Sequence, residues 1–374
     1  MIFLLNNLNF LYNDELLTLR LRKLYESAGF KKFRMSKFES YDFYAKNKDF
    51  LHGQRIITFS DLNGKLMALK PDVTLSIVKS ADSDERQKLY YTENVYRESK
   101  DVHEFKEISQ VGLEVLGNID LYQTVEIIIL AIKSLLEIDT DAILDISHMG
   151  YTEGLLDCLT DDIALRGELH KLICGKNAHD IIKLADEYML PMNPVNTAVG
   201  LMISKNTNEE SIADATTNAL NSKMQNAVKE ISCIYDILKK QGLEKYVRID
   251  FSGTGDPNYY NGILMHGYVH GVPRDVLSGG RYDMLLNKMG KECTNAMGFA
   301  IYFDALDRQL HKKTANGEIV YILYNDDSDI NTLLSLTEKL NREGVVCNTV
   351  TKIPDGAKGK IFRITGNNVE EEAL

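Results

Sequence analysis

One short stretch, residues 108–117, places an amide, a glycine and a carboxylate on the same side of an extended chain. It reads ISQVGLEVLG, so in a strand Gln110, Gly112 and Glu114 project to one face and the apolar residues between them project to the other. Gln110 and Glu114 would stand roughly 13 Å apart at strand rise, with Gly112 leaving room between them. A carboxylate that faces a cleft can hold an ammonium group, and an amide can orient a polar ligand. The alternative is a solvent-facing strand whose polar groups pair with neighbouring strands.

A second pair of candidate polar groups follows an expected hairpin, in the stretch LKPDVT. Pro71 ends the strand, so Asp72 and Thr74 can present a carboxylate and a hydroxyl group at the start of the next helix. The alternative is that Asp72 only caps a helix over residues 73–80. The hairpin itself is predicted from Asn63-Gly64, which is expected to supply the positive φ angles of a tight turn.

Two further motifs favour ordinary structural roles. FSGTGDPNYYNG has two glycines of a dinucleotide-binding loop, but the third is missing and a strand-like segment follows, which excludes that reading. Its Tyr259 and Tyr260 are candidates for a pocket wall or for the core. His170, Cys174 and His179 are close in sequence, but no second cysteine pair accompanies them, so the sequence predicts no metal site.

The composition is that of a globular protein with no dedicated nucleic-acid surface. The 374 residues carry a formal net charge of −11, which disfavours phosphate contacts, and 44% of them are hydrophobic. The N-terminal segment lacks a basic region and a small-residue cleavage site, and no apolar run reaches membrane-spanning length. Five scattered cysteines indicate reduced thiols. We therefore expect a cytoplasmic protein.

The order of expected elements predicts an α+β fold. Antiparallel strands are expected over residues 55–72, 88–99 and 105–117, and helices over 13–28 and from 121 onwards. Asp120 is expected to cap the second helix. Residues 151 to about 246 read as a helical, polar insertion, after which strands resume. The expected organisation is one domain over 1–315 that carries this insertion, and a small α/β unit over 317–374.

Taken in order, six motifs resemble the catalytic domain of histidyl-tRNA synthetase, a class II synthetase. They are FSDLNGKLMALKPDVT, YYTENVYRE, ISQVGLEVLG, YYNGI, GGRYD and MGFAI, and the likeness covers residues 10–150 and 246–310. The resemblance implies an antiparallel sheet flanked by helices. Arg97 matches the motif 2 arginine that grips the ATP phosphates in that family. The positions that match a histidine pocket are Asp72, Thr74, Gln110, Glu114, Tyr259 and Tyr260.

Several arginines of that family are absent from this sequence. Gly255 stands where the family has its histidine-specific catalytic arginine, and Ala305 stands at about the position of the motif 3 arginine. The second arginine region of motif 2 reads DVHEF, which is acidic, and Ser36 replaces the motif 1 proline. Each donor that stabilises charge on the reacting group contributes on the order of 100-fold or more to a rate. Synthetase chemistry is therefore expected to be severely impaired.

A synthetase fold with a retained histidine pocket and lost ATP-binding arginines resembles the regulatory subunit of ATP phosphoribosyltransferase. That family is non-catalytic: it pairs with a short catalytic subunit in the first step of histidine biosynthesis, and histidine inhibits the complex. The resemblance implies no cofactor, L-histidine as the allosteric ligand and Arg97 as a relic of phosphate binding. It also implies a homodimer core within a hetero-oligomer, without nucleic-acid or membrane partners. The alternatives are a divergent histidyl-tRNA synthetase and a synthetase-like ligase for another amino acid.

Overall fold

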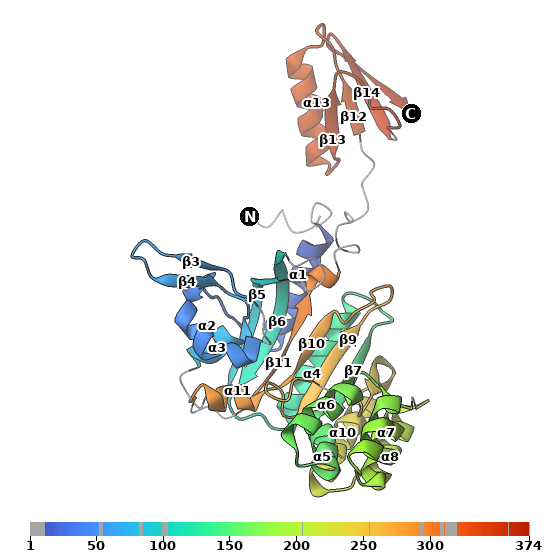
Figure 1. Ribbon diagram of the computed structural model, residues 1–374. Helices are drawn as coiled ribbons and strands as arrows, with labels where there is room; N and C mark the ends of the chain where they lie inside the picture. The colour runs from blue at the N-terminus through green and yellow to red at the C-terminus, as the bar shows by residue number, and fades with distance from the viewer. Residues whose placement is uncertain are drawn as a thin grey trace. The chain divides into compact units, whose positions relative to one another are not determined.

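The computed structural model describes residues 12–51, 55–81, 85–98, 104–203, 205–253, 255–291, 295–306, 310, 320–357 and 359–373. They belong to two compact units, Leu17–Asp307 and a second that includes Arg308–Leu374 (Figure 1). The larger unit is built on an eight-stranded sheet and the smaller one on a four-stranded sheet.

The eight-stranded sheet forms the centre of the larger unit. Its strands are β1 (Lys31–Lys32), β5 (Gln87–Glu98), β6 (Phe105–Leu116), β7 (Ile143–His148), β8 (Val247–Ile249), β9 (Ile263–Tyr268), β10 (Leu277–Arg281) and β11 (Ala296–Tyr302). The spatial order is β1-β5-β6-β11-β10-β9-β7-β8. The interior pairs are antiparallel, whereas the edge pairs β1–β5 and β7–β8 are parallel. The predicted α+β class is confirmed.

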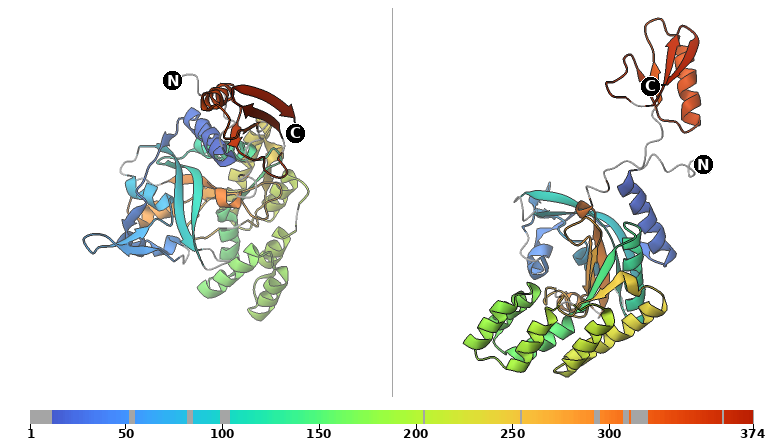
Figure 2. Two further views of the ribbon diagram at one scale, coloured as in Figure 1. Left: turned by 90° about the horizontal axis from the view of Figure 1, so that it is seen from above. Right: turned by 90° about the vertical axis from the view of Figure 1, so that its right-hand side faces the viewer.

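Two long helices cover the apolar face of this sheet (Figure 2). They are α1 (Asn13–Ser27) and α4 (Leu121–Leu136), and the hydroxyl groups of Tyr25 and Ser134 join them at 2.9 Å. The predicted cap of α4 is confirmed, because the Asp120 side chain accepts a hydrogen bond from the backbone N–H of Gln123. The apolar side chains of β6 at positions 111, 113 and 115 are fully buried. The opposite face of β6 is therefore the one left for a site.

Short elements between β1 and β5 pack over that opposite face. They are β2 (Phe38–Ser40), α2 (Tyr41–Lys46), η2 (Lys48–Leu51), β3 (Thr58–Ser60), β4 (Leu66–Leu69) and α3 (Thr74–Ser80). The β3–β4 hairpin is as predicted, but its turn is not. Of the two expected turn residues, Asn63 and Gly64, only Gly64 has a positive φ, of 78°. Asp61 closes the turn instead, because its Oδ1 accepts hydrogen bonds from the backbone N–H groups of Asn63 and Lys65.

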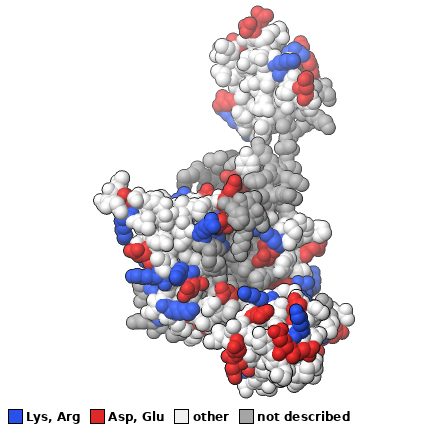
Figure 3. All heavy atoms as spheres, viewed as in Figure 1, with Lys and Arg blue, Asp and Glu red and all other residues white. Residues whose placement is uncertain are grey.

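The segment between β7 and β8 is helical, as the sequence predicts. Its helices are α5 (Met149–Leu159), α6 (Ile163–Cys174), α7 (Ala178–Glu187), α8 (Met192–Leu201), α9 (Asn208–Thr217) and α10 (Ser222–Lys240), followed by η3 (Glu244–Tyr246). Capping side chains on Asp162, Asn177, Thr207 and Asn221 start four of them. Asp and Glu side chains gather on this insertion (Figure 3). None of the helices in the described ranges is both long and apolar enough to cross a membrane.

The smaller unit is a four-stranded sheet with one helix. Its elements are β12 (Val320–Leu323), α13 (Ile330–Arg342), β13 (Cys347–Val350), β14 (Lys360–Thr365) and β15 (Asn368–Ala373), and the sheet order is β13-β12-β14-β15. Ile322, Leu340 and Ile364 form the centre of its own hydrophobic core, with Val320 beside them. The described part of this unit is thus a compact α/β unit with its own core.

Candidate functional site

One cavity of about 480 Å³ collects every site residue that the sequence singles out. It lies on the polar face of β6, and the predicted residues that line it are Asp72, Thr74, Arg97, Gln110, Glu114, Tyr259 and Tyr260. Residues far apart in the sequence meet here because β6 pairs with β5 on one side and with β11 on the other. The volume is within the usual range for a small-molecule site, about 300–1,000 Å³.

Glu114 is held at the floor of this cavity by two hydroxyl groups. Thr74 donates a hydrogen bond to Oε1 at 2.9 Å, and Tyr282 donates one to Oε2 at 2.6 Å. The carboxylate lies across the neighbouring strand over Gly298, where a Cβ atom would stand only 1.8 Å from Oε2. A glycine at 298 is therefore a steric requirement of this arrangement, and Glu114 is fixed in place before any ligand arrives.

The electrostatic environment of Glu114 disfavours its charged form. Only 3% of the residue is exposed, and burial raises the pKa of its carboxyl group to about 8. The two hydroxyl donors oppose this rise, whereas the negative charge of nearby Asp72 adds to it. The raised pKa favours the neutral form of Glu114 at pH 7, and a cationic ligand group would favour its ionisation.

This raised pKa predicts a pH-dependent stability. The carboxyl group loses its proton at about pH 4.5 when the chain is unfolded and at about pH 8 when it is folded. Folding therefore takes up a proton between these values, so stability should fall as pH rises from 4.5 to 8, by an upper limit of about 5 kcal/mol. The variant Glu114→Gln has no carboxyl group to titrate at this position, so it should not lose stability in this way as pH rises. Its urea midpoint should exceed that of the wild type by a margin that widens from pH 5 to pH 8, and a constant margin would contradict the buried neutral state.

Gln110 faces the cavity as predicted, but the expected empty space over Gly112 is occupied. A Cβ atom at residue 112 would stand 2.5 Å from the hydroxyl oxygen of Tyr91, which lies opposite it on β5. The prediction of an open seat at Gly112 was wrong, because the glycine makes room for the Tyr91 ring. Gln110 is 2% exposed, and its Nε2 makes no hydrogen bond with any described residue. That amide retains a donor for a ligand.

Asp72 caps a helix, which is one of the two alternatives that the sequence left open, and it also lines the cavity. Its Oδ1 accepts a hydrogen bond from the backbone N–H of Leu75 at 2.8 Å, which caps the start of α3. Its Oδ2 lies 3.2 Å from a terminal nitrogen of Arg97, whose Nε also donates to the carbonyl oxygen of Pro71. Arg97 is thus already neutralised by a carboxylate. The guanidinium that would grip phosphates is held against Asp72.

Tyrosine rings form the remaining wall. Tyr259 packs against Tyr260 and Tyr282 with ring centroids 4.7 and 5.7 Å away, and burial raises the pKa of all three phenols. They therefore stay protonated and can donate hydrogen bonds. Tyr259 and Tyr260 lie just before β9. The sequence analysis did not assign Tyr91 or Tyr282 to the site, although Tyr282 belongs to the quoted GGRYD motif.

Positive charge is scarce around the cavity. Among the described residues that line it, Arg97 is the single lysine or arginine, whereas the carboxyl groups of Asp72, Glu114 and Asp256 all line it. Gly255 lies at the wall, where a Cβ atom would stand 2.9 Å from the ring of Tyr260. A larger side chain at residue 255 would thus press on the tyrosine wall. Residues 101–103 of the acidic motif 2 loop lie outside the described residues.

Comparison with known families identifies the family of this chain. The family model for histidyl-tRNA synthetase matches residues 11–306, which is most of the chain. The chain belongs to the histidyl-tRNA synthetase family. Among curated relatives of this family member, one from Clostridium acetobutylicum is named ATP phosphoribosyltransferase regulatory subunit. It is 28% identical over 343 residues, which cover 87% of this chain and 82% of the relative.

Solved structures of histidyl-tRNA synthetase relatives share the fold. An ATP phosphoribosyltransferase regulatory subunit/histidyl-tRNA synthetase from Bacillus halodurans superposes with a TM-score of 0.76 at 22% identity and covers 92% of this chain and 90% of its own. A chain of the ATP phosphoribosyl transferase (HisG:HisZ) complex from Thermotoga maritima gives a TM-score of 0.62 at 20% identity, over 81% of this chain and 99% of its own. Ala305, at about the position expected for the motif 3 arginine, ends the 3₁₀ helix Phe303–Ala305 that follows β11.

Proposed function

We propose that this chain is the non-catalytic regulatory subunit of ATP phosphoribosyltransferase. In this role it is required for the activity of a short catalytic subunit, and it carries feedback inhibition by histidine in the first step of histidine biosynthesis. The names of the curated relatives and the complex from Thermotoga maritima support the role. The observation that carries the proposal is the charge of the cavity. Arg97 carries the single guanidinium among the described lining residues, and it is already paired with Asp72.

A nucleoside triphosphate is a poor ligand for such a cavity. Phosphoryl and adenylyl transfer depend on cationic groups that neutralise charge developing on the phosphate. Here Asp72 and Asp256 would repel a polyphosphate, and the space beside Gly255 is bounded by Tyr260 and Leu264. The arrangement thus supports binding without chemistry.

A free amino acid with a basic side chain suits the same cavity. Glu114 and Asp72 supply acceptors for an α-ammonium or imidazole group, and the protonated tyrosines and the Gln110 amide supply donors. We therefore propose L-histidine as the ligand of this cavity. Its binding would favour one arrangement of the assembly and so be coupled to catalysis on the partner, with a coupling free energy of about 1–3 kcal/mol.

The first test concerns synthetase activity. Because Gly255 and Ala305 replace the expected arginines and Arg97 is neutralised, histidine-dependent exchange between ATP and pyrophosphate should stay at background. The measurement uses the purified full chain with a working histidyl-tRNA synthetase as the positive control. Clear exchange would instead favour the alternative of a divergent synthetase.

The second test concerns the partner. The chain alone should not convert ATP and phosphoribosyl pyrophosphate. Mixed with a short catalytic subunit from the same organism, it should elute as a larger complex, raise the activity and make it sensitive to histidine. In size-exclusion chromatography with light scattering, we expect a homodimer of this chain as the core of that complex. Separate elution of the two proteins at micromolar concentration would count against the proposal.

A further inference from the structure

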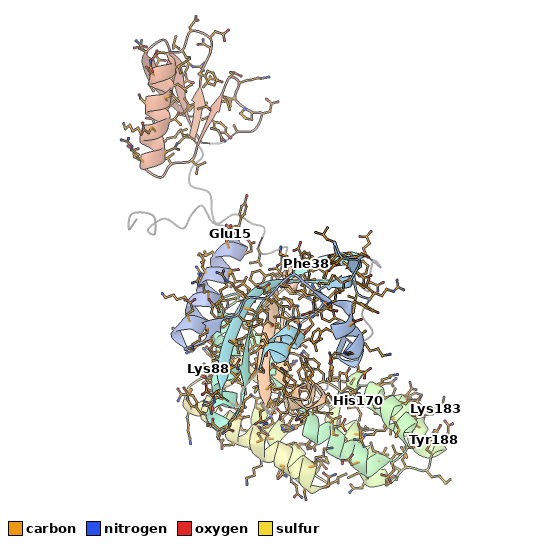
Figure 4. The ribbon with its side chains drawn as sticks, turned by 90° about the vertical axis from the view of Figure 1, so that its left-hand side faces the viewer. Glu15, Phe38, Lys88, His170, Lys183 and Tyr188 are labelled. Carbon is orange, nitrogen blue, oxygen red and sulfur yellow. The ribbon has the colours of Figure 1, made fainter. Side chains whose placement is uncertain are left out.

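A thiol and an imidazole lie together outside the cavity described above. Cys174 ends α6, and His170 stands one helical turn before it, so both side chains lie on the same face of the helix. The Sγ atom of Cys174 is 3.7 Å from Nδ1 of His170, within hydrogen-bond distance for sulfur. Figure 4 labels His170 on the insertion. Neither residue contributes to the proposed histidine site.

The surroundings of His170 favour its protonated form. The hydrogen bond with Cys174 raises the pKa of the imidazole, partial burial opposes the rise, and the charges of Cys174, Glu153 and Asp256 raise it further. Arg166, one turn earlier on α6, donates hydrogen bonds to Glu153 and to Asp157. Its positive charge is therefore engaged by these two carboxylates. The Nε2 atom of His170 is buried without a hydrogen-bond partner among the described residues, which opposes protonation in the same direction as the partial burial of the ring. An imidazolium beside sulfur stabilises a thiolate.

The thiol opens onto a second cavity of about 390 Å³. Cys174 is exposed and lines this cavity together with Lys176, Arg248 and Asp250. Lys176 pairs with Asp250 at 2.9 Å, and Arg248 pairs with Asp145 on the neighbouring strand β7. A small zwitterionic molecule could exchange these internal ion pairs for pairs with its own carboxylate and ammonium groups, so that no charge would be left without a partner. The C-terminal end of α6 disfavours a thiolate, but this effect is weak at an exposed position.

We propose that Cys174 is a modification site that forms mixed disulfides with small zwitterionic disulfides such as cystine, and that His170 activates its thiol. The thiolate sulfur of Cys174 attacks one sulfur of the disulfide, and a new S–S bond forms as the old one breaks. The departing thiolate takes its proton from the His170 imidazolium. No further oxidant is required, because one disulfide is exchanged for another.

The size of the effect follows from two opposing factors. An ordinary exposed thiol with a pKa of about 8.5 is about 1% thiolate at pH 6.5. If the imidazolium keeps at least half of Cys174 as thiolate, the reactive fraction rises about 50-fold. The lower basicity of that thiolate reduces its nucleophilicity roughly 10-fold. We therefore expect Cys174 to react about 5-fold faster than an ordinary thiol at pH 6.5.

The chain supplies its own control for this measurement. Cys233 on α10 is also exposed, and its neighbours one turn away are Lys229 and Ile237 rather than a histidine. The full-length protein is treated with cystine at pH 6.5, and the cysteinylated peptides are followed by mass spectrometry. Cys174 should react about 5-fold faster than Cys233, and in His170→Gln the two rates should become equal.

A second measurement keeps the test decisive if His170→Gln does not fold. Between pH 6 and pH 8 the wild-type rate at Cys174 should change much less than the rate of a free reference thiol such as glutathione, whose thiolate fraction rises by nearly 10-fold per pH unit. Equal rates at the two cysteines at pH 6.5, or a Cys174 rate that His170→Gln leaves unchanged at that pH, would overturn the proposal.

Discussion

The variant Glu114→Gln should bind histidine about 10- to 150-fold more weakly than the wild-type protein. The substitution keeps the shape of the side chain, and its amide can accept from one of the Thr74 and Tyr282 hydroxyl groups and donate to the other. It removes the carboxylate that a cationic ligand group would meet. A hydrogen bond to a charged group contributes about 1.5–3 kcal/mol, which corresponds to that range of affinity. Calorimetric titration of the assembled complex with L-histidine measures it.

Two observations make this result interpretable. Glu187→Gln, at the exposed end of α7, is a matched control and should leave the affinity unchanged. Folding and assembly of Glu114→Gln should persist, because the buried apolar side chains at 111, 113 and 115 carry the packing of β6. Unchanged histidine affinity in Glu114→Gln would remove this cavity as the histidine site and point to a subunit interface.

The variant Gly298→Ala should abolish histidine binding and destabilise the larger unit. The added Cβ atom would stand 1.8 Å from Oε2 of Glu114 and 2.3 Å from the carbonyl oxygen of Leu113. The second of these is backbone at the centre of the sheet, so it cannot move without disturbing the β6–β11 pairing. Overpacking of this kind costs about 1–3 kcal/mol of the free energy of unfolding. Urea unfolding and calorimetric titration measure the two effects.

The control for Gly298→Ala is Gly167→Ala on α6. A Cβ atom at residue 167 would meet nothing within 4 Å, and alanine is favoured over glycine inside a helix by about 1 kcal/mol, so this variant should be as stable as the wild type or more so. If Gly298→Ala folds poorly, the double variant with Glu114→Ala should recover part of the stability but no histidine binding. A Gly298→Ala protein that keeps both stability and binding would show that Glu114 is free to lie elsewhere.

Local pattern alone predicted several elements, whereas the site residues were proposed from the resemblance of the ordered motifs to a known family. Strict alternation over residues 110–115 predicted a strand with one polar face, and Asp120 three residues before Gln123 predicted the start of α4. Both features depend only on residues that are close in sequence, so they can be predicted without knowledge of the fold. The absence of arginine at 255 and 305 is likewise readable from the sequence once the order of motifs is recognised.

The tertiary structure decided what surrounds each predicted side chain. Glu114 and Gly298 are separated by 184 positions and meet only because β6 and β11 pair in one register. The register of β5 against β6 likewise places Tyr91 opposite Gly112. Register is a long-range property that alternation does not specify, since every shift by two residues preserves the apolar face. The sequence by itself therefore determined which side of β6 is polar and which family the motifs resemble. Only the fold decided that Glu114 is buried and neutral, that Arg97 is held by Asp72, and that a tyrosine fills the space over Gly112.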